Sequence, residues 1–339
     1  MRLLVTGATG VVGSAVVDRL LKIPGVDVSV LTRGTAIEGV PAVNHVLGDL
    51  QQTQLGLSLG DYRGLTMRID RIVHIASVVD FDADPDVILN TNVGGAAGMA
   101  QLAQDAGAEL LYVSTSYTAK LMPGARVRGA GCVTGRNAYL ASKAAGDTLV
   151  SAAGVPFQIA KPSILIGDSQ TGEIRRLQGL HTFIRAFLSG AMPFFPGTED
   201  TLIDFIPVDV VADRVVELAL KPTELDGSTS WLTAGESAPT VNELCRWIGD
   251  ATGSGLPSFR FMSVDTVQRL IVPAFLGGLG DRDRRRFENL LALTALFDDN
   301  PFQSSPDAVG NRVEKETLRR SVAAAVKMLE QPRAVTVSA

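Results

Sequence analysis

Two side chains one helical turn apart in this chain suit proton transfer. Tyr139 and Lys143 stand in the run Tyr-Leu-Ala-Ser-Lys, inside a stretch, Ala138–Ala153, whose apolar spacing predicts a helix. Residues four apart on a helix lie on the same face. A lysine ammonium beside a tyrosine favours the phenolate and so lowers the tyrosine pKa. The tyrosine can then pass a proton to or from a carbonyl oxygen.

Three hydroxyl residues follow a predicted strand upstream of that pair. Ser114, Thr115 and Ser116 close the apolar run Glu109–Ser114. A hydroxyl at the end of such a strand can donate a hydrogen bond to a substrate oxygen that gathers negative charge. The alternative is that three small polar residues simply end a strand.

The N-terminus carries a pattern that suits a pyrophosphate. A predicted strand, Arg2–Thr6, meets Gly7, Gly10 and Gly13 and passes into an apolar-periodic helix, Val11–Lys22. The first glycine permits a tight turn, the second lets backbone approach phosphate, and the third lets the helix lie close to the strand. With the helix N-terminus, this arrangement predicts a dinucleotide site. A tight turn without a ligand would also use some of these glycines.

Residues after the second and third predicted strands indicate which dinucleotide binds. Asp27–Thr32 is followed by Arg33, where a chain that prefers NAD would carry an acidic residue for the ribose 2′-hydroxyl. An arginine suits the 2′-phosphate of NADP, so we expect NADP(H) rather than NAD(H). Asp49, after Val43–Leu47, is placed to reach the adenine amino group. The alternatives are a solvated arginine and an Asp49 that caps a turn.

Strands alternate with helices through the first half of the chain, which predicts an α/β fold with a doubly wound parallel sheet. Such a sheet binds ligands beyond the carboxyl ends of its strands, where all of these residues fall. The remaining predicted elements of this part are Arg71–Ile75, Asp86–Ala106 and Phe157–Lys161.

Beyond residue 167 the alternation becomes irregular. We expect residues 1–167 to form the NAD(P)-binding domain, its sheet completed by parts of 203–235. Residues 168–332 would form a smaller, mostly helical substrate lobe, and 333–339 a disordered tail. The predicted elements of the lobe are helices at Arg176–Ser189, Val208–Leu220, Val241–Thr252, Val264–Leu276, Arg284–Phe297 and Val313–Glu330, and strands at Ile203–Ile206, Ser230–Thr233 and Ser258–Phe261.

Composition narrows the class of protein. The chain has 339 residues and a formal net charge of −5, which argues against a nucleic-acid partner. Its longest apolar run is too short and glycine-rich to span a bilayer, and because a predicted strand begins at Arg2 we expect no signal peptide. Cys132 and Cys245 show no metal-like spacing, so we expect reduced, structural thiols and a cytoplasmic protein. His74 fits a core histidine lining the cofactor bed, and no metal site is expected.

Together these motifs resemble the extended short-chain dehydrogenase/reductase superfamily. The matching segments, spread over residues 1–220, are Thr6–Gly13, Gly48–Leu50, His74–Ser77, Thr91–Val93, Ser114–Thr115, Tyr139…Lys143 and Lys161–Ile164. In the last segment, behind the nicotinamide, an arginine more often stands at the position of Lys161.

The resemblance implies a catalytic triad of Thr115, Tyr139 and Lys143, with the lysine also holding the nicotinamide ribose. Thr115 matches the family position because it directly follows Ser114. The cofactor-binding residues implied are Gly7, Thr9, Gly10, Val11, Val12, Gly13, Arg33, Asp49, Leu50, Ala76, Ser77, Tyr139, Lys143, Pro162, Ser163 and Ile164.

Within the superfamily the chain looks most like the fatty acyl-CoA reductases and carrier-protein thioester reductases. Ser77–Asp82, Val113–Tyr117 and Ile203–Val211 carry this likeness. It implies NADPH-dependent reduction of an acyl thioester, bound to CoA or to an acyl carrier protein, or of the derived aldehyde. Ser116 and Phe81 would contact the substrate. No catalytic cysteine is needed, because hydride attacks the acyl carbonyl directly.

Other interpretations of the sequence remain open. The same site suits a ketone or hydroxysteroid-like alcohol dehydrogenase, a sugar-nucleotide epimerase or dehydratase, or, less well, an NADP sensor without catalysis. Arg282 and Arg284–Arg286 are either solvent-exposed residues at the start of a helix or a surface that binds an anionic substrate carrier. Four phenylalanines would line an acyl chain or form the lobe core: Phe183, Phe187, Phe194 and Phe195. The sequence does not indicate the oligomeric state.

Overall fold

The computed structural model divides the chain into two compact units. Unit 1 contains Met1–Ser163, Val211–Thr233 and Ser304–Asn311, and unit 2 the described residues of Ile164–Val210, Ala234–Gln303 and Arg312–Ala339. The structure describes residues 1–34, 43–80, 83–120, 135–190, 194–222, 227–253, 260–263, 266–267, 269, 297, 300–307 and 309–331.

Unit 1 is built on a seven-stranded sheet in the order β10-β6-β5-β4-β1-β2-β3. Every neighbouring pair of strands is parallel. The predicted α/β fold with a doubly wound parallel sheet is therefore confirmed. The strands are β1 (Arg2–Thr6), β2 (Asp27–Thr32), β3 (Asn44–Leu47), β4 (Arg71–His74), β5 (Glu109–Val113), β6 (Phe157–Pro162) and β10 (Ser228–Leu232).

The strand order reverses at β1, which pairs with β2 on one side and β4 on the other. Leu3, Leu4 and Val5 are buried, as expected of a strand covered on both faces. At its carboxyl end, Thr6 lies beside Leu31 of β2 and His74 of β4. Doubly wound sheets bind ligands where the strand order reverses, so this part of the edge is the expected place for a ligand.

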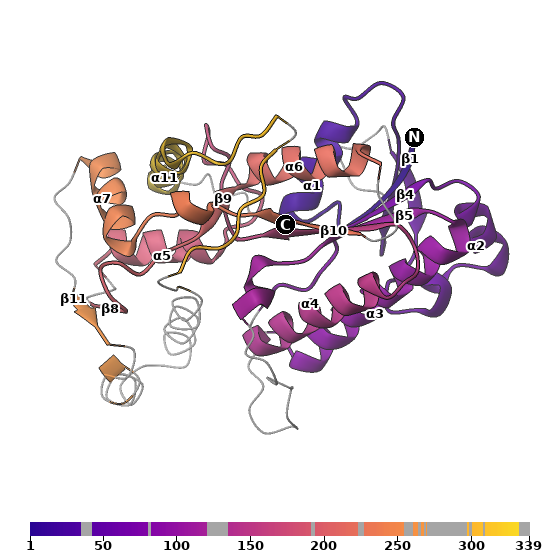
Figure 1. Cartoon of the computed structure of the whole chain (residues 1–339), viewed down its shortest axis with the longest axis horizontal. Coiled ribbons are helices and arrows are strands. Elements are labelled where there is room, and N and C mark those ends of the chain that lie inside the picture. Colours follow the sequence, from indigo (N-terminus) through magenta and orange to yellow (C-terminus); the bar gives the residue numbers. More distant parts are fainter. Residues whose placement is uncertain are drawn as a thin grey trace, which may run out of the picture. The chain divides into compact units, whose positions relative to one another are not determined.

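Helices cover both faces of the sheet, α3 and α4 on one and α1 and α6 on the other (Figure 1). Their bounds are α1 (Val11–Leu20), α2 (Leu59–Thr66), α3 (Pro85–Ala106), α4 (Gly135–Ser151) and α6 (Val208–Leu220), whose first three residues belong to unit 2. The buried Arg71 of β4 donates to the Leu218 carbonyl of α6 at 2.7 Å and pairs with Glu109 of β5.

The sequence patterns missed helix α2, which lies between β3 and β4. Its apolar stripe is short, because only Tyr62 and Leu65 are buried, and Gly60 and Gly64 weaken its helix propensity. The helix begins at a local cap in which the Ser58 hydroxyl accepts from the Asp61 amide at 3.1 Å.

The described residues of unit 2 form their own core between two short parallel pairs of strands and three helices. Strand β7 (Ile164–Ile166) pairs with β9 (Phe205–Pro207), and β8 (Phe194–Pro196) with β11 (Arg260–Met262). The helices are α5 (Gly179–Leu188), α7 (Val241–Thr252) and α11 (Lys315–Glu330), and a short 3-10 turn, η3, spans Gly235–Ser237.

The phenylalanines singled out in the sequence lie in this core. Phe183, Phe187 and Phe195 are at most 1% exposed and belong to its main apolar cluster, and Phe194 is also buried. Phe183 meets Phe195 edge to face, with ring centroids 6.1 Å apart. This placement favours the core interpretation over an acyl-chain lining. Cys245 of α7 is a free, buried thiol, as predicted.

Several predictions lie outside the described residues. They are most of the two helices predicted at 264–276 and 284–297, Cys132, Phe81, the arginines at 282 and 284–286, and the tail 333–339. Within the described ranges, no helix combines the length and apolar content that a passage through a bilayer requires.

Candidate active site

The turn after β1 forms a cradle whose close contacts require glycine. Gly7 adopts φ 74°, and its carbonyl accepts from the Gly10 amide at 2.8 Å. A Cβ on Gly13 would lie 2.0 Å from the Gly7 oxygen, and one on Gly7 would lie 2.6 Å from the Ala76 amide nitrogen. The helix, the turn and the loop after β4 therefore approach one another as closely as backbone allows.

Helix α1 presents its N-terminus to this cradle. Gly10 is its N-cap, no side chain of the described residues caps it, and its first turn holds no acidic residue. The amides of Val11, Val12 and Gly13 belong to that first turn, where an anion is stabilised by unpaired N–H groups and the helix dipole. Thr9 is exposed at the tip of the preceding turn.

The loop after β4, which forms the other side of the cradle, is held in place by Thr6. Its hydroxyl accepts from the amides of Ile75 and Ala76 at 3.2 and 3.1 Å. Its own proton is then directed to His74 Nδ1, 2.7 Å away. Burial, with a smaller contribution from Lys143, lowers the pKa of His74 to about 3, so the imidazole is neutral. His74 is a core histidine, as the sequence indicated, and it stacks on Tyr112.

The loop after β4 continues into a buried polar network. Asn92 of α3 accepts from the Val78 amide at 2.7 Å and donates to the Val78 carbonyl at 3.0 Å. It also donates to Ser142 of α4 at 2.9 Å, and Ser142 donates to the Tyr139 carbonyl at 2.7 Å. The network joins the Ala76–Ser77 loop to the helix that carries Tyr139.

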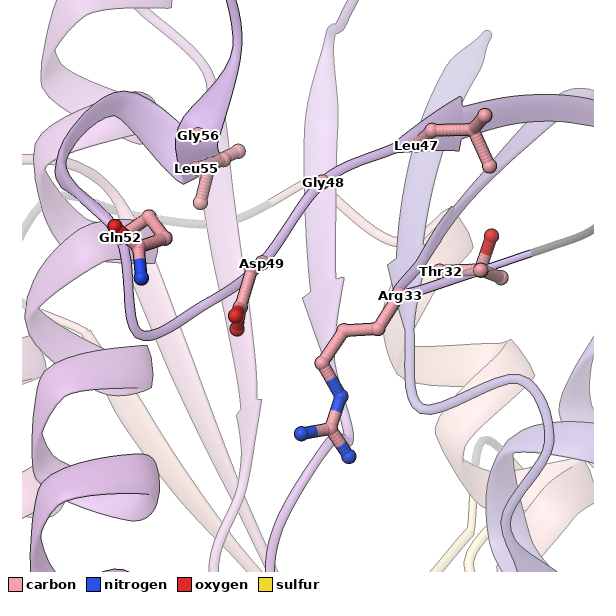
Figure 2. A pocket seen from close by; sticks show the side chains of 9 residues that line it. Thr32, Arg33, Leu47, Gly48, Asp49, Gln52, Leu55 and Gly56 are labelled. Atoms are coloured by element: carbon pink, nitrogen blue, oxygen red, sulfur yellow. The ribbon is translucent and has the colours of Figure 1, made fainter.

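A cavity of about 530 Å³ opens beyond the carboxyl ends of β2 and β3. We call it the Arg33 pocket; its lining residues are Thr32, Arg33, Gly34, Leu47, Gly48, Asp49, Gln52, Leu55 and Gly56. Figure 2 shows the side chains of Arg33 and Asp49 extending in the same direction from two neighbouring chain segments. One cationic and one acidic side chain are thus offered to a ligand from adjacent strand ends.

The far wall of the Arg33 pocket is held by a left-handed turn, η1 (Thr53–Gly56). Gln54 and Leu55 have φ values of 51° and 61°, which residues other than glycine rarely adopt. The buried Leu55 anchors the turn in the core, and its carbonyl accepts from the Asp49 amide at 2.8 Å. Asp49 also accepts from the Gln51 amide at 3.0 Å, while Leu50 packs against the core under α3.

Tyr139 and Thr115 come together at the carboxyl edge of β5. Their side chains are hydrogen-bonded, and Tyr139 is half-buried. Burial raises the pKa of Tyr139 to about 12, and the negative charge of Asp147 adds to this, against the Thr115 hydrogen bond. The lowering predicted from Lys143 is therefore wrong, because desolvation of the phenolate dominates. The phenol keeps its proton at neutral pH.

Lys143 is 2% exposed and is held in place by β5. Its ammonium donates to the Val113 carbonyl at 2.9 Å and lies 5.0 Å from the centre of the Tyr112 ring. Burial lowers its pKa to about 8, while Asp147 raises it. An ammonium that has one fixed partner keeps two further donors for a ligand.

Four buried hydroxyls at the carboxyl ends of β4, β5 and β6 have no hydrogen-bond partner among the described residues. They are Ser77, Ser114, Ser116 and Ser163. A buried hydroxyl without a partner costs free energy, so such groups in one region indicate a site built for a polar ligand. Together with the glycine cradle, they fit a nicotinamide dinucleotide.

Unit 1 thus brings together nearly all of the predicted site residues. These residues lie along the carboxyl edge of its sheet. They are the cradle glycines, Ala76, Ser77, Ser114–Ser116, Tyr139, Lys143, Pro162 and Ser163. Ile164 begins β7 and belongs to unit 2.

Two side chains next to the site were not singled out in the sequence. Ser142 lies within the Tyr-Leu-Ala-Ser-Lys run, and Asp147 lies four residues beyond Lys143. Helical spacing alone points to Asp147 as a neighbour of Lys143.

With this geometry in view, comparison with known proteins identifies the family. Residues 36–215, more than half of the chain, match the model of the NAD-binding family described as male sterility protein. The chain belongs to this family, a branch of the extended short-chain dehydrogenase/reductases. It is an oxidoreductase dependent on a nicotinamide cofactor, and the resemblance inferred from the sequence is confirmed.

Relatives of the chain occur in biosynthetic synthetases. It is 27% identical over 228 residues, 63% of its length, to the hybrid PKS-NRPS synthetase poxE of Penicillium oxalicum. It is 26% identical over 275 residues, 75% of its length, to the PKS-NRPS hybrid synthetase psoA of Aspergillus fumigatus. The chain spans only 6% and 7% of the length of these two synthetases.

Solved structures share the fold. The terminal R domain from the myxalamid PKS-NRPS biosynthetic pathway superposes with a TM-score of 0.72 at 21% identity, covering 96% of this chain and 90% of that one. The UDP-glucuronic acid 4-epimerase of Bacillus cereus, in complex with NAD, gives a TM-score of 0.59 at 17% identity, covering 78% of this chain and 87% of that one.

Proposed function

We propose that this chain is an NADPH-dependent reductase of acyl thioesters that uses Thr115, Tyr139 and Lys143. The observation that carries the proposal is the Thr115–Tyr139 hydrogen bond, with the Lys143 ammonium one helical turn away on the same face of α4. The proposed substrate is a thioester on a carrier protein or on CoA, because the relatives are synthetases and the sequence resembles thioester reductases.

The cofactor would lie along the carboxyl edge of the sheet. The first-turn amides of α1 would bind the pyrophosphate, and the Arg33 pocket the adenosine end. Lys143 would use its free donors on the nicotinamide ribose, and Ser77, Pro162 and Ser163 would face the same part of the cofactor. When bound, the reduced nicotinamide supplies a hydride.

Tyr139 and Thr115 would serve the carbonyl oxygen. Both can donate a hydrogen bond to that oxygen as negative charge develops on it. Tyr139 would then deliver its proton to the oxygen, a role that suits a phenol whose raised pKa keeps it protonated. Ser116, fully buried beside them, would contact the substrate. The oxyanion becomes a hydroxyl, and the carbon–sulfur bond can then break to release aldehyde and thiol.

Arg33 supports NADPH over NADH. An exposed guanidinium at the mouth of its pocket can bind a 2′-phosphate through a charge-assisted contact, which NADH does not offer. Asp49, on the opposite segment, would receive the adenine amino group.

A substrate panel tests the proposed function. The purified chain is incubated with NADPH and acyl-CoA, acyl-pantetheine, aldehyde or ketone, and the NADPH absorbance is followed. We expect thioester-dependent loss of absorbance and appearance of free thiol. Turnover of ketones alone would assign an alcohol dehydrogenase instead. Tightly retained cofactor with no net consumption would assign an epimerase, and either outcome would refute the thioester proposal.

A further inference from the structure

A carboxylate continues the face of α4 that carries Tyr139 and Lys143. Asp147 lies one turn beyond Lys143, and its side chain is 16% exposed. Its Oδ2 accepts from Lys161 of β6 at 2.6 Å. Its Oδ1 is buried and has no partner in the part of the chain that the structure describes. A carboxylate in this position acts on the groups around it through its charge as well as through its hydrogen bond.

Lys161 is held by contacts on three sides. Besides Asp147, its ammonium donates to the Thr118 hydroxyl at 2.9 Å and lies 5.3 Å from the centre of the Trp231 ring. Thr118 in turn donates to the Thr115 carbonyl at 3.0 Å. These contacts fix the position of the Lys161 ammonium. Its positive charge therefore offsets the negative charge of Asp147 at a fixed distance. Lys161 also ties the Asp147 carboxylate to the segment that carries Thr115.

Lys143 lies where these charges act on it. The titratable or charged groups that face it come from three strands and its own helix: Tyr139 and Asp147 on α4, Tyr112 on β5, His74 on β4, and Lys161 on β6 behind Asp147. Tyr112 and His74 are neutral, because burial raises the pKa of the first and lowers that of the second. The net field at Lys143 from ionised side chains therefore depends on Asp147 and its partner.

We propose that Asp147 and Lys161 are positioning residues that set the charge of Lys143 and, through it, the pH range of the reaction. The effect on the pH range of the reaction rests on the proposed reductase function, whereas the effect on the charge of Lys143 does not. Asp147 favours the ammonium form of a lysine that burial would otherwise deprotonate, and Lys161 limits this effect by neutralising the carboxylate.

Titration of Lys143 itself tests the proposal. The protein is labelled with ¹³C at the lysine Cε, the Lys143 signal is assigned with K143M, and its pKa is measured by NMR. In D147N we expect the pKa to fall by about one pH unit, the size of shift that one nearby charge produces. In K161M we expect it to rise, and in K161R to stay unchanged because the cation is kept. Asp105→Asn removes an exposed carboxylate on α3, and we expect no shift.

The outcomes separate this inference from a purely structural role. A double variant, D147N/K161M, leaves neither charge buried alone, and its Lys143 pKa should lie between those of the single variants. Unchanged Lys143 titration in folded D147N would overturn the proposal. If no thioester is reduced while the titration shifts as expected, the reductase function fails and the electrostatic role stands. If both hold, the pH–rate profile moves with the NMR value.

Discussion

The two ends of the candidate cofactor site are built in different ways. At the α4 end, Lys143 is buried and Tyr139 half-buried, and both have fixed partners on β5 or at its carboxyl end. At the other end, Arg33 is exposed in an open pocket walled by a strained left-handed turn. Burial changes the pKa of groups at the first end, whereas the second offers a solvated charge. The first end suits chemistry, and the second suits selection between cofactors.

Removal of the proton donor should lower the rate more than any other substitution described below. Tyr139→Phe removes the hydroxyl and keeps the ring, so we expect kcat to fall by about 10²- to 10⁴-fold, the usual contribution of a general acid. Cofactor affinity, measured by quenching of protein fluorescence, should stay unchanged. Tyr62→Phe is the matched control, because that hydroxyl bonds Asp105 at 2.8 Å, away from the cradle. Retained turnover in Y139F would remove Tyr139 from the mechanism.

The cradle between the two ends should be the next most sensitive part. In Gly13→Ala the new Cβ would meet the Gly7 oxygen at 2.0 Å, so backbone must move, at a cost of about 1–3 kcal/mol. We expect a lower Tm and weaker binding of NADPH and NADH alike. Gly64→Ala in α2 is the control, since its Cβ meets nothing within 4 Å and the Tm should hold or rise. Equal Tm and affinity in G13A and wild type would contradict the close approach.

Cofactor choice depends on the open end. Arg33→Ala should weaken NADPH binding by about 10- to 100-fold, the loss of a charge-assisted contact of roughly 1.5–3 kcal/mol. NADH binding should change little, because NADH lacks the 2′-phosphate. Arg63→Ala, on the exposed surface of α2, should affect neither cofactor. Isothermal titration of both cofactors decides, and equal affinity of the wild type for both would refute the preference for NADPH.

The smallest effect is a change with pH. The pKa of Lys143 is lowered to about 8, so raising the pH through 8 removes the ammonium, and we expect the rate to decline there. Tyr139, with a pKa near 12, stays protonated over this range. Stability should change in the opposite sense. The unfolded chain keeps the lysine proton up to its ordinary pKa of 10.5, so this group makes the free energy of unfolding rise between pH 8 and 10.5.

Measurements of kcat and of Tm over the same pH range separate these two trends. As the pH rises from 8 to 10, we expect kcat to fall, while the contribution of Lys143 to stability keeps the Tm constant or raises it. A rate that stays constant from pH 7 to 10 would show that the charge of Lys143 is not used.

Local sequence patterns were sufficient to predict much of the fold and of the candidate site. The glycine turn, the helical spacing of Tyr139 and Lys143, and the apolar strands are each encoded within a few residues. Helix α2 was missed because its apolar stripe is short and two glycines interrupt it. The direction of the Tyr139 pKa was also missed, because desolvation depends on what folds over the phenol. Asp147 and Lys161 are 14 residues apart and meet only through packing of α4 against the sheet.

A single-turnover experiment would observe the proposed reduction of a thioester by this chain itself. Enzyme in excess, loaded with NADPH, is mixed with an acyl-phosphopantetheine thioester, and thiol release and NADPH consumption are followed together. We predict that thiol appears with one or two equivalents of NADPH consumed, for aldehyde or alcohol respectively, and that Y139F releases none on the same timescale. Release of thiol without NADPH consumption, or equal release by Y139F, would contradict proton delivery by Tyr139 to a reduced thioester carbonyl.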